Sequence, residues 1–280
     1  MPEIAFLNGS FMPIADAVVS IEDRGFQLGD GVYEVIVTYD GRPYALAEHL
    51  ARLRRSLNEI RIAYDIDAYG LQGIIEDGVR RSGYADALIY IQITRGVAPR
   101  RHQFPDDPIR PTVVITVTEY KRPPPEEHAK GVMLISTSDQ RWHRCDIKSI
   151  CLLPNALARQ EAAEAGAYEA LLVNSDGYVT EGAATSAFCV RAGELWTTPE
   201  GPHILPSISR AILLKLARQA DIPVHEGFRT LEFFKGADEV FLAGTTTETL
   251  AVVQIDERII GTGKPGPITG KIRAAFLETL

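Results

Sequence analysis

A helical periodicity of apolar residues is clearest between residues 46 and 60. Leucines and an isoleucine recur there every three or four positions, which predicts an amphipathic helix that buries one stripe. The stripe consists of Leu46, Leu50, Leu53, Leu57 and Ile60. A second helix is predicted from Asp67 to Ser82. Apolar and β-branched runs predict strands at 4–7, 10–14, 32–39, 88–94 and 112–118. The pair Asp40-Gly41 is typical of a hairpin turn.

The second half of the chain mixes short strands with helices. Strands are predicted at 131–137, 168–173, 186–190, 223–226, 238–243 and 250–255, and helices at 155–166, 207–220 and 265–279. Asn155 and Ser207 are candidate helix N-caps, and Gly166 fits a helix end. Because strands and helices do not alternate regularly, the pattern favours an α+β or mixed α/β fold over a doubly wound sheet.

A proline-rich segment interrupts both periodicities. Residues 121–127 read Lys-Arg-Pro-Pro-Pro-Glu-Glu, and consecutive prolines favour an extended polyproline conformation. We therefore expect a linker at 121–127 between a smaller N-terminal domain at 1–120 and a larger C-terminal domain at 128–280. A chain of 280 residues with 45% apolar composition is long enough to give each domain its own core.

The charge balance narrows the range of partners. A net charge of −8 argues against nucleic acid, which needs a basic surface. The cysteines, Cys145, Cys151 and Cys189, lack the spacing of a zinc site or a disulfide framework, so we expect reduced thiols and no metal. The chain shows no signal sequence and no apolar run long enough to span a membrane. We therefore expect a cytoplasmic protein without a membrane partner.

One lysine and one carboxylate suggest a specific chemistry. Lys148 lies in the segment Arg144-Cys145-Asp146-Ile147-Lys148-Ser149, and Glu181 lies in Thr180-Glu181-Gly182. A lysine amine can form a Schiff base with an aldehyde, and a carboxylate can keep a pyridine nitrogen protonated. This pair would suit pyridoxal 5′-phosphate. The pattern alone also fits a solvent-facing lysine on a half-buried strand and a surface glutamate at a strand end.

Several longer segments carry a family resemblance. Residues 22–34, 48–53 and 94–105, together with the lysine and Thr-Glu-Gly segments, resemble the fold-type IV pyridoxal-phosphate enzymes. The similarity is greatest to bacterial D-amino acid transaminases. It implies a two-domain fold with a smaller N-terminal α/β domain, and a pyridoxal 5′-phosphate cofactor.

The resemblance also assigns roles around the cofactor. Lys148 would hold the cofactor as a Schiff base and then move a proton, and Glu181 would pair with the pyridine nitrogen. Arg52, Ile208 with Ser209, and Thr245 would bind the phosphate. Periodicity by itself places Arg52 off the buried stripe and predicts a solvated side chain. The Thr245 segment also fits an ordinary turn.

The substrate site follows from the same resemblance. Tyr33, together with Arg100 and His102 from the neighbouring subunit, would receive the substrate carboxylate, which implies a homodimer. Without the resemblance, Arg100 and His102 would be read as a solvated basic loop. Two departures, Ala183-Ala184-Thr185 and Gly244, stand where the family often has serines. These departures predict weaker retention of the cofactor.

The implied function is transfer of an amino group between D-amino acids, such as D-alanine and D-glutamate, and 2-oxo acids, such as pyruvate and 2-oxoglutarate. The same fold also suits a branched-chain L-amino acid transaminase, an (R)-amine transaminase or an aminodeoxychorismate lyase. A regulatory protein that binds the cofactor without turnover is the alternative from a different class.

Overall fold

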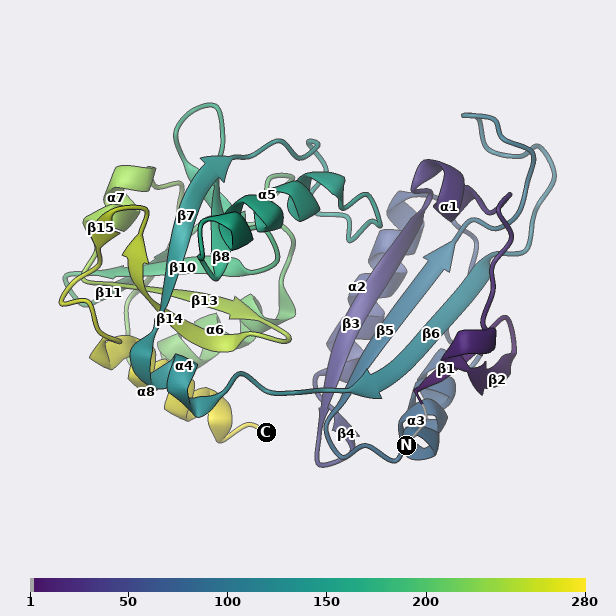
Figure 1. The fold of residues 1–280 in the computed structure, drawn as a ribbon, viewed down its shortest axis with the longest axis horizontal. Helices are drawn as coiled ribbons and strands as arrows, with labels where there is room; N and C mark the ends of the chain where they lie inside the picture. Colours follow the sequence, from purple (N-terminus) through teal and green to yellow (C-terminus); the bar gives the residue numbers. More distant parts are fainter. Residues whose placement is uncertain (1–2) are drawn as a thin grey trace. The chain divides into compact units, whose positions relative to one another are not determined.

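The computed structural model describes residues 3–280 and divides the chain into two compact units. The first unit comprises the chain up to Lys121 together with Ile147–Cys151. The second comprises Arg122–Asp146 and Leu152–Leu280. The short return of residues 147–151 to the first unit is not predicted by any contiguous division of the sequence. Each unit combines a sheet with covering helices, so the expected mixed α/β fold is confirmed (Figure 1).

The first unit is built on a six-stranded sheet in the order β2-β1-β6-β5-β3-β4. Its strands are β1 (Ile4–Leu7), β2 (Ser10–Pro13), β3 (Gly31–Tyr39), β4 (Arg42–Pro43), β5 (Ala87–Thr94) and β6 (Thr112–Glu119). Its helices are the 3-10 turn η1 (Ile14–Asp16), α1 (Arg24–Leu28), α2 (Leu46–Glu59) and α3 (Leu71–Ser82). Figure 1 shows α2 and α3 along the sheet.

Alternation along β5 explains how this sheet packs. Ile89, Ile91 and Ile93 are fully buried and share one core with Leu53 and Leu57 of α2. The residues between those isoleucines remain partly exposed on the opposite face. A strand with period two therefore meets a helix with the expected leucine stripe.

The second unit contains a nine-stranded sheet in the order β12-β11-β10-β13-β14-β7-β8-β9, with β15 paired to β14. Its strands are β7 (Val132–Ser138), β8 (Glu169–Val173), β9 (Val179–Gly182), β10 (Ser186–Arg191), β11 (Glu194–Thr197), β12 (Val224–Glu226), β13 (Glu239–Gly244), β14 (Glu248–Ile255) and β15 (Arg258–Ile259). Its helices are α4 (Pro125–Lys130), α5 (Leu153–Glu164), α6 (Ile208–Gln219), α7 (Leu231–Lys235) and α8 (Pro267–Leu277).

Local signals were accurate where the residue's own chemistry sets the conformation. Asp40 and Gly41 both have positive φ, as a tight hairpin turn requires, and they join β3 to β4. Ser207 caps α6, its side chain accepting from the Arg210 amide. Gly166 follows α5 with φ +68° and ends it.

Other local predictions were wrong. Asn155 is not an N-cap, because α5 begins at Leu153 and the side-chain Nδ2 of Asn155 donates to the Ala183 carbonyl at 2.7 Å. The proline-rich segment is not extended throughout, because Pro125 occupies the first turn of α4, where a missing N–H costs nothing. The second helix begins at Leu71 rather than Asp67. Short elements such as α1 and β9 lacked a clear period and were not predicted.

Within residues 3–280, every helix is too short or too polar to cross a lipid bilayer.

Candidate active site

Lys148 lies beside the edge of β3 that β5 leaves open. The Tyr33 amide donates to the Lys148 carbonyl at 3.0 Å, and the Ile150 amide donates to the Gly31 carbonyl at 3.1 Å. Ser149 forms an isolated bridge with Val32. Lys148 is therefore held by backbone bonds in an irregular segment, and the expectation that it lies on a regular strand was wrong. A Cβ at Gly31 would lie 2.9 Å from the Ile93 carbonyl oxygen and 3.0 Å from the Ile150 side chain, so the close backbone approach of β5 requires glycine here.

The Lys148 amine approaches the face of Tyr33. Its Nζ lies 4.3 Å from the Tyr33 ring centroid, within the range of a cation–π contact. Tyr33 pairs across β3 and β5 with Gln92, and its ring lies 5.7 Å from that of Tyr90. Burial raises the pKa of Tyr90 to about 12, so this hydroxyl stays protonated at neutral pH. Lys148 and Tyr33 are thus two of the expected site residues that the first unit brings together.

Arg52 is buried, contrary to the prediction from periodicity. Its guanidinium donates to both carboxylate oxygens of Glu34, at 2.7 and 2.8 Å. His49 completes the cluster, with Nδ1 2.7 Å from Glu34 Oε2. Glu34 is on β3, whereas His49 and Arg52 are on α2. The ion pair explains the burial, because a charged side chain enters a core only with a partner.

The cluster has a defined protonation state. Burial opposes ionisation of Glu34, but Arg52 and His49 outweigh it and lower the pKa of Glu34 to about 2. Burial lowers the pKa of His49, as do the charges of Arg52 and Lys148, so the ring is neutral at pH 7. Since a carboxylate only accepts, the His49 proton is on Nδ1. Sequence reasoning missed Glu34 and His49, although both lie inside the segments that carry the family resemblance.

Glu181 is buried on β9, so its reading as a surface residue was wrong. Its Oε1 accepts from the Arg141 guanidinium and from the Leu205 amide, the latter at 3.1 Å. Burial raises the pKa of Glu181, and Arg141 opposes this rise. Within residues 3–280, Oε2 of Glu181 has no hydrogen-bond donor. This oxygen can therefore accept from a ligand.

Arg141 is a further site residue that the sequence did not reveal. Its side chain is 8% exposed and forms a second ion pair with Asp139, at 2.8 Å. The Thr180 hydroxyl donates to the same Asp139 at 2.7 Å. Asp139 and Glu181 together raise the pKa of Arg141. The one signal available in the sequence was proximity along the chain, because Arg141 lies only seven residues before Lys148.

The turn after Glu181 is fixed by a buried carboxylate. Glu169 accepts from the Ala184 amide at 3.1 Å and from the Thr185 hydroxyl at 3.3 Å. Thr185, the one hydroxyl left in this turn, is therefore engaged within the protein. A Cβ at Gly244 would lie 3.4 Å from Thr185 Cγ2, so the turn packs against the β13–β14 hairpin.

The three expected phosphate ligands in the second unit all lie at element ends. Ile208 and Ser209 form the first turn of α6, and Thr245 lies in the turn between β13 and β14. Amides in a first helical turn lack intrahelical acceptors, which suits an anion. Neither the Ser209 nor the Thr245 hydroxyl bonds to any residue in 3–280.

Arg100 and His102 lie in the loop between β5 and β6, residues 95–111, which we call the β5–β6 loop. Both are exposed, and neither side chain has a polar partner within the described part of the chain. The fold leaves these two side chains available to a ligand or to another chain.

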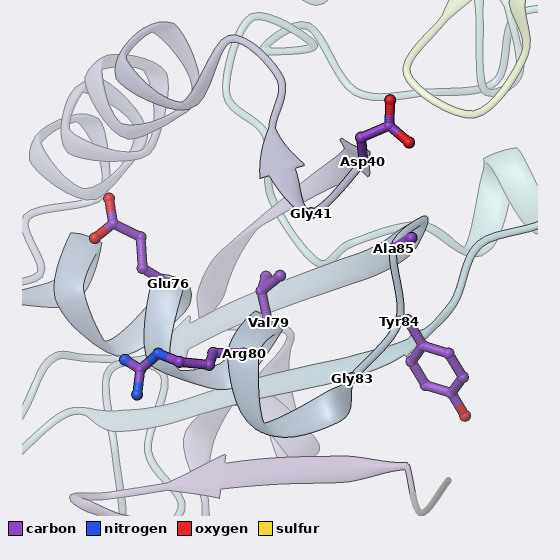
Figure 2. Close-up of a pocket in the computed structure, with 8 residues that line it drawn as sticks. All are labelled: Asp40, Gly41, Glu76, Val79, Arg80, Gly83, Tyr84 and Ala85. Carbon is purple, nitrogen blue, oxygen red and sulfur yellow. The ribbon is translucent and has the colours of Figure 1, made fainter.

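A hollow of about 330 Å³ lies elsewhere on the first unit (Figure 2). It is at the Asp40-Gly41 end of β3 and is lined by Glu76 and Arg80 of α3 and by Tyr84. None of the expected site residues contributes to it. Among residues 3–280, no cluster of side chains could hold a metal ion.

Each unit holds residues whose chemistry suits pyridoxal 5′-phosphate. In the first unit Lys148 supplies an amine, and in the second Glu181 supplies a buried carboxylate whose Oε2 can accept from a protonated ring nitrogen. Arg52 and the first turn of α6 supply donors suited to a phosphate.

Comparisons with known proteins support this fit. The model of the family "Amino-transferase class IV" matches residues 31–255. D-alanine aminotransferase of Bacillus licheniformis is 39% identical over 276 residues, covering 98% of this chain and 95% of that protein. D-alanine aminotransferase of Staphylococcus haemolyticus is 38% identical over 271 residues, covering 97% and 95%.

Two similar solved structures are branched-chain amino acid aminotransferases. One was solved with pyridoxamine 5′-phosphate and has a TM-score of 0.90 and 30% identity, covering 99% of this chain and 94% of its own. The other, from Escherichia coli, has a TM-score of 0.88 and 27% identity, with the same coverage of 99% and 94%. With its lysine and carboxylate in the fold of these proteins, the chain belongs to the class IV aminotransferases, which are pyridoxal-phosphate-dependent enzymes of fold type IV.

Proposed function

We propose that this aminotransferase exchanges amino groups between D-amino acids and 2-oxo acids. The observation that carries the proposal is the exposure of two side chains that can be cationic, Arg100 and His102, in the β5–β6 loop. They suit a substrate that presents a carboxylate. The two relatives named D-alanine aminotransferase support the same substrate class.

Bound pyridoxal 5′-phosphate supplies an aldehyde that captures amines and a ring that absorbs the electron pair left when a Cα–H bond breaks. Lys148 would hold the aldehyde through its amine, and the same amine, once free, would be placed to take a proton from the substrate Cα. Its backbone bonds to β3 keep the amine within a narrow range of positions, as a proton transfer requires.

Glu181 would accept from the ring nitrogen, and its Oε2 is the oxygen without a donor within residues 3–280. Burial raises the pKa of this carboxyl and Arg141 opposes the rise, so Arg141 favours the ionised form that an unpaired buried carboxyl would not keep. The pair therefore offers a fixed, charged acceptor to the ring nitrogen without an uncompensated charge in the protein.

The phosphate would be bound by Arg52, by the Ile208 and Ser209 amides and by the Thr245 hydroxyl. Because Glu34 neutralises most of the Arg52 charge, Arg52 contributes an oriented donor more than a strong field. The helix N-terminus then has a correspondingly larger share in binding the dianion.

Tyr33, Arg100 and His102 receive the substrate carboxylate. A guanidinium binds a carboxylate in two parallel hydrogen bonds, which fixes orientation as well as affinity. Only a Cα–H bond perpendicular to the ring is broken easily, so the held position of the carboxylate selects one enantiomer.

A homodimer is part of the proposal, with Arg100 and His102 acting in the partner's site. Exposed apolar side chains of the first unit support it, because Val18, Ile21 and Phe26 are 76%, 76% and 72% exposed in the single chain. The test mixes Lys148→Ala with Arg100→Ala protein after dissociation and reassociation. Each mixed dimer then holds one intact site if Arg100 acts in the partner, and about a quarter of wild-type activity should return. Activity no higher than that of Arg100→Ala alone would mean that Arg100 serves its own chain.

Substrate handedness is tested by a single half-reaction. The visible absorbance of the bound cofactor should decay with D-alanine and persist with L-alanine. Arg100→Ala should raise KM for D-alanine by the equivalent of about 2–5 kcal/mol of lost charged contact. The neighbouring Arg101→Ala is the matched control and should leave KM near the wild-type value.

The solved branched-chain enzymes define the competing outcome. A preference for L-leucine over D-alanine, with Arg100→Ala indifferent, would reject the D-amino acid proposal and assign the chain to their substrate class.

A further inference from the structure

The backbone around His102 is held by a buried arginine. Arg24 of α1 is 2% exposed, and its Nη1 donates to the carbonyls of Arg101 at 2.7 Å and of Gln103 at 3.2 Å. These two carbonyls flank His102. The loop around them is otherwise exposed and has no regular secondary structure, so this guanidinium holds the residues on both sides of His102.

Asp30 joins Arg24 to a second buried arginine. Its Oδ2 accepts from Nε of Arg24 and from Nε of Arg95, both at 2.8 Å. Arg95 also donates to the Ile60 and Arg61 carbonyls at the end of α2, at 2.7 and 2.9 Å. The pair of arginines is therefore fixed to the body of the first unit and not only to the loop.

The second arginine holds the far side of the loop through an aromatic ring. The Arg95 guanidinium carbon lies 3.6 Å from the centroid of Phe104, whose side chain is 42% exposed. The Arg95 guanidinium thus stacks against the Phe104 ring while its nitrogens donate to backbone carbonyls. Hydrogen bonds at Arg101 and Gln103 and a stack at Phe104 bracket His102 closely in sequence.

The base of the loop is closed by packing. Asp23 accepts from the hydroxyls of Thr94 and Thr112, at 3.0 and 2.6 Å, and so joins α1 to the ends of β5 and β6. Gly96 has φ +111°, and a Cβ there would lie 2.1 Å from the Arg110 carbonyl oxygen. The loop backbone is therefore tightly packed where it leaves the sheet. Arg24 and Arg95 contact the loop residues beyond this point.

We propose that Arg24, Asp30 and Arg95 are positioning residues that hold the β5–β6 loop in the conformation that receives the substrate carboxylate. The proposal rests on the proposed function of Arg100 and His102. Arginine is required at position 24 because its planar fork reaches Asp30 and the loop carbonyls together. A lysine ammonium is a compact point charge and cannot hold both in the same geometry.

Two variants test the anchor. Arg24→Lys keeps a charge for Asp30, which also retains Arg95, so no buried carboxylate loses every partner. Phe104→Ala removes the partly exposed ring that stacks on Arg95 and leaves the sheet core unchanged. It therefore tests the proposal even if Arg24→Lys does not fold. Arg101→Ala is the control, because it removes a loop side chain while keeping the carbonyl that Arg24 binds.

The first readout is limited trypsin digestion, with cleavage after Arg100 or Arg101 followed by mass spectrometry. Loss of charge-assisted hydrogen bonds in Arg24→Lys, or of the stack on Arg95 in Phe104→Ala, should raise the local opening population, so both variants should be cut about tenfold faster than wild type. The second readout separates positioning from general damage. KM for D-alanine should rise about tenfold, while the affinity of the cofactor-free protein for pyridoxal 5′-phosphate stays at the wild-type value.

The outcomes distinguish the anchor from the function on which it rests. Arg100→Ala is measured alongside, and an unchanged KM in that variant rejects the carboxylate role of the loop whatever the anchor does. If Arg100→Ala raises KM but Arg24→Lys and Phe104→Ala leave KM or the cleavage rate unchanged, the anchor proposal is overturned. A parallel loss of cofactor affinity would also overturn it, because the arginines would then act on the fold as a whole.

Discussion

Replacing Arg141 with methionine removes the cation that two buried carboxylates share. Glu181 would keep only the Leu205 amide, and Asp139 would keep the Thr180 hydroxyl. Both carboxylates are about as buried as Arg141, with side chains 8% and 10% exposed. Breaking a buried pair by removing one partner costs about 3–5 kcal/mol, because the remaining charge is left without compensation. We expect Arg141→Met to lose stability of that order at pH 7.5 in the cofactor-free protein.

The loss should depend on pH with a definite sign. Burial raises the pKa of Glu181, and without Arg141 that pKa rises further above its unfolded value. A carboxyl with a raised folded-state pKa binds more protons in the folded protein, so folding stability falls as pH rises through the range between the two values. Arg141 also lowers the pKa of Asp139 below its usual range, so that stabilisation is lost only at lower pH and is similar at pH 5 and pH 7.5. Glu181 therefore makes the deficit of Arg141→Met larger at pH 7.5 than at pH 5.

Thermal unfolding of the cofactor-free protein measures this deficit. For a unit of this size, 1 kcal/mol shifts Tm by about 2–4 °C, so a drop of about 6–20 °C is expected at pH 7.5 and a smaller one at pH 5. Arg141→Lys is the matched control and should recover part of the loss. Adding Glu181→Gln to Arg141→Met removes the orphaned charge and should raise Tm above that of the single variant.

Two results would refute this reasoning. A deficit that is equal at both pH values would mean that packing, not charge, makes Arg141 important. A double variant less stable than Arg141→Met would mean that Glu181 is stabilising without Arg141, and that the two residues are not a coupled pair.

Three further predictions concern single residues. Lys148→Ala should yield a folded protein with no turnover and no borohydride-reducible link to the cofactor, and a retained link in mass spectra would reject its assignment. Arg52→Ala should release cofactor into an ultrafiltrate faster than wild type when D-alanine is supplied without an oxo acid, because the covalent tether is then absent; no release from either protein would contradict the weak retention inferred from Ala183 and Gly244. Gly96→Ala should lower Tm by at least several degrees, since its Cβ would overlap the Arg110 carbonyl, and an unchanged Tm would mean that the base of the loop can shift.

The sequence predicted those parts of the fold that depend on neighbours along the chain. The alternation of β5 and the leucine stripe of α2 determine which faces are buried, and both patterns are visible in any window of a dozen residues. The predictions of a cap at Ser207 and a turn at Asp40-Gly41 were accurate for the same reason, since a cap or a tight turn depends on only a few neighbouring residues. Periodicity cannot report a partner that arrives from a distant part of the chain.

Arg52 illustrates that limit. Its place on α2 is off the leucine stripe, and it is buried because Glu34, on a different element, accepts hydrogen bonds from two of its guanidinium nitrogens. Glu181 is similar, because its burial depends on Arg141, which precedes it by forty residues. In both cases the residue type was informative about chemistry and misleading about exposure. The return of residues 147–151 to β3 is a long-range pairing of the same kind, and short irregular segments carry no period that would reveal it.

The two ion pairs also explain how side chains proposed to bind a cofactor can be buried before it binds. On the proposed function, Arg52 and Glu181 would each meet one end of pyridoxal 5′-phosphate, and each is buried, where a lone charge would cost several kcal/mol. Within its own unit, each side chain has a partner, Glu34 or Arg141, that offsets that cost and holds it in one orientation. Neither side chain then has to reorient within its unit on binding. The same pairing reduces the net charge that each end presents, so geometry rather than field strength must supply the affinity, and a variant that disturbs Glu34 or Arg141 should impair cofactor binding without touching the cofactor itself.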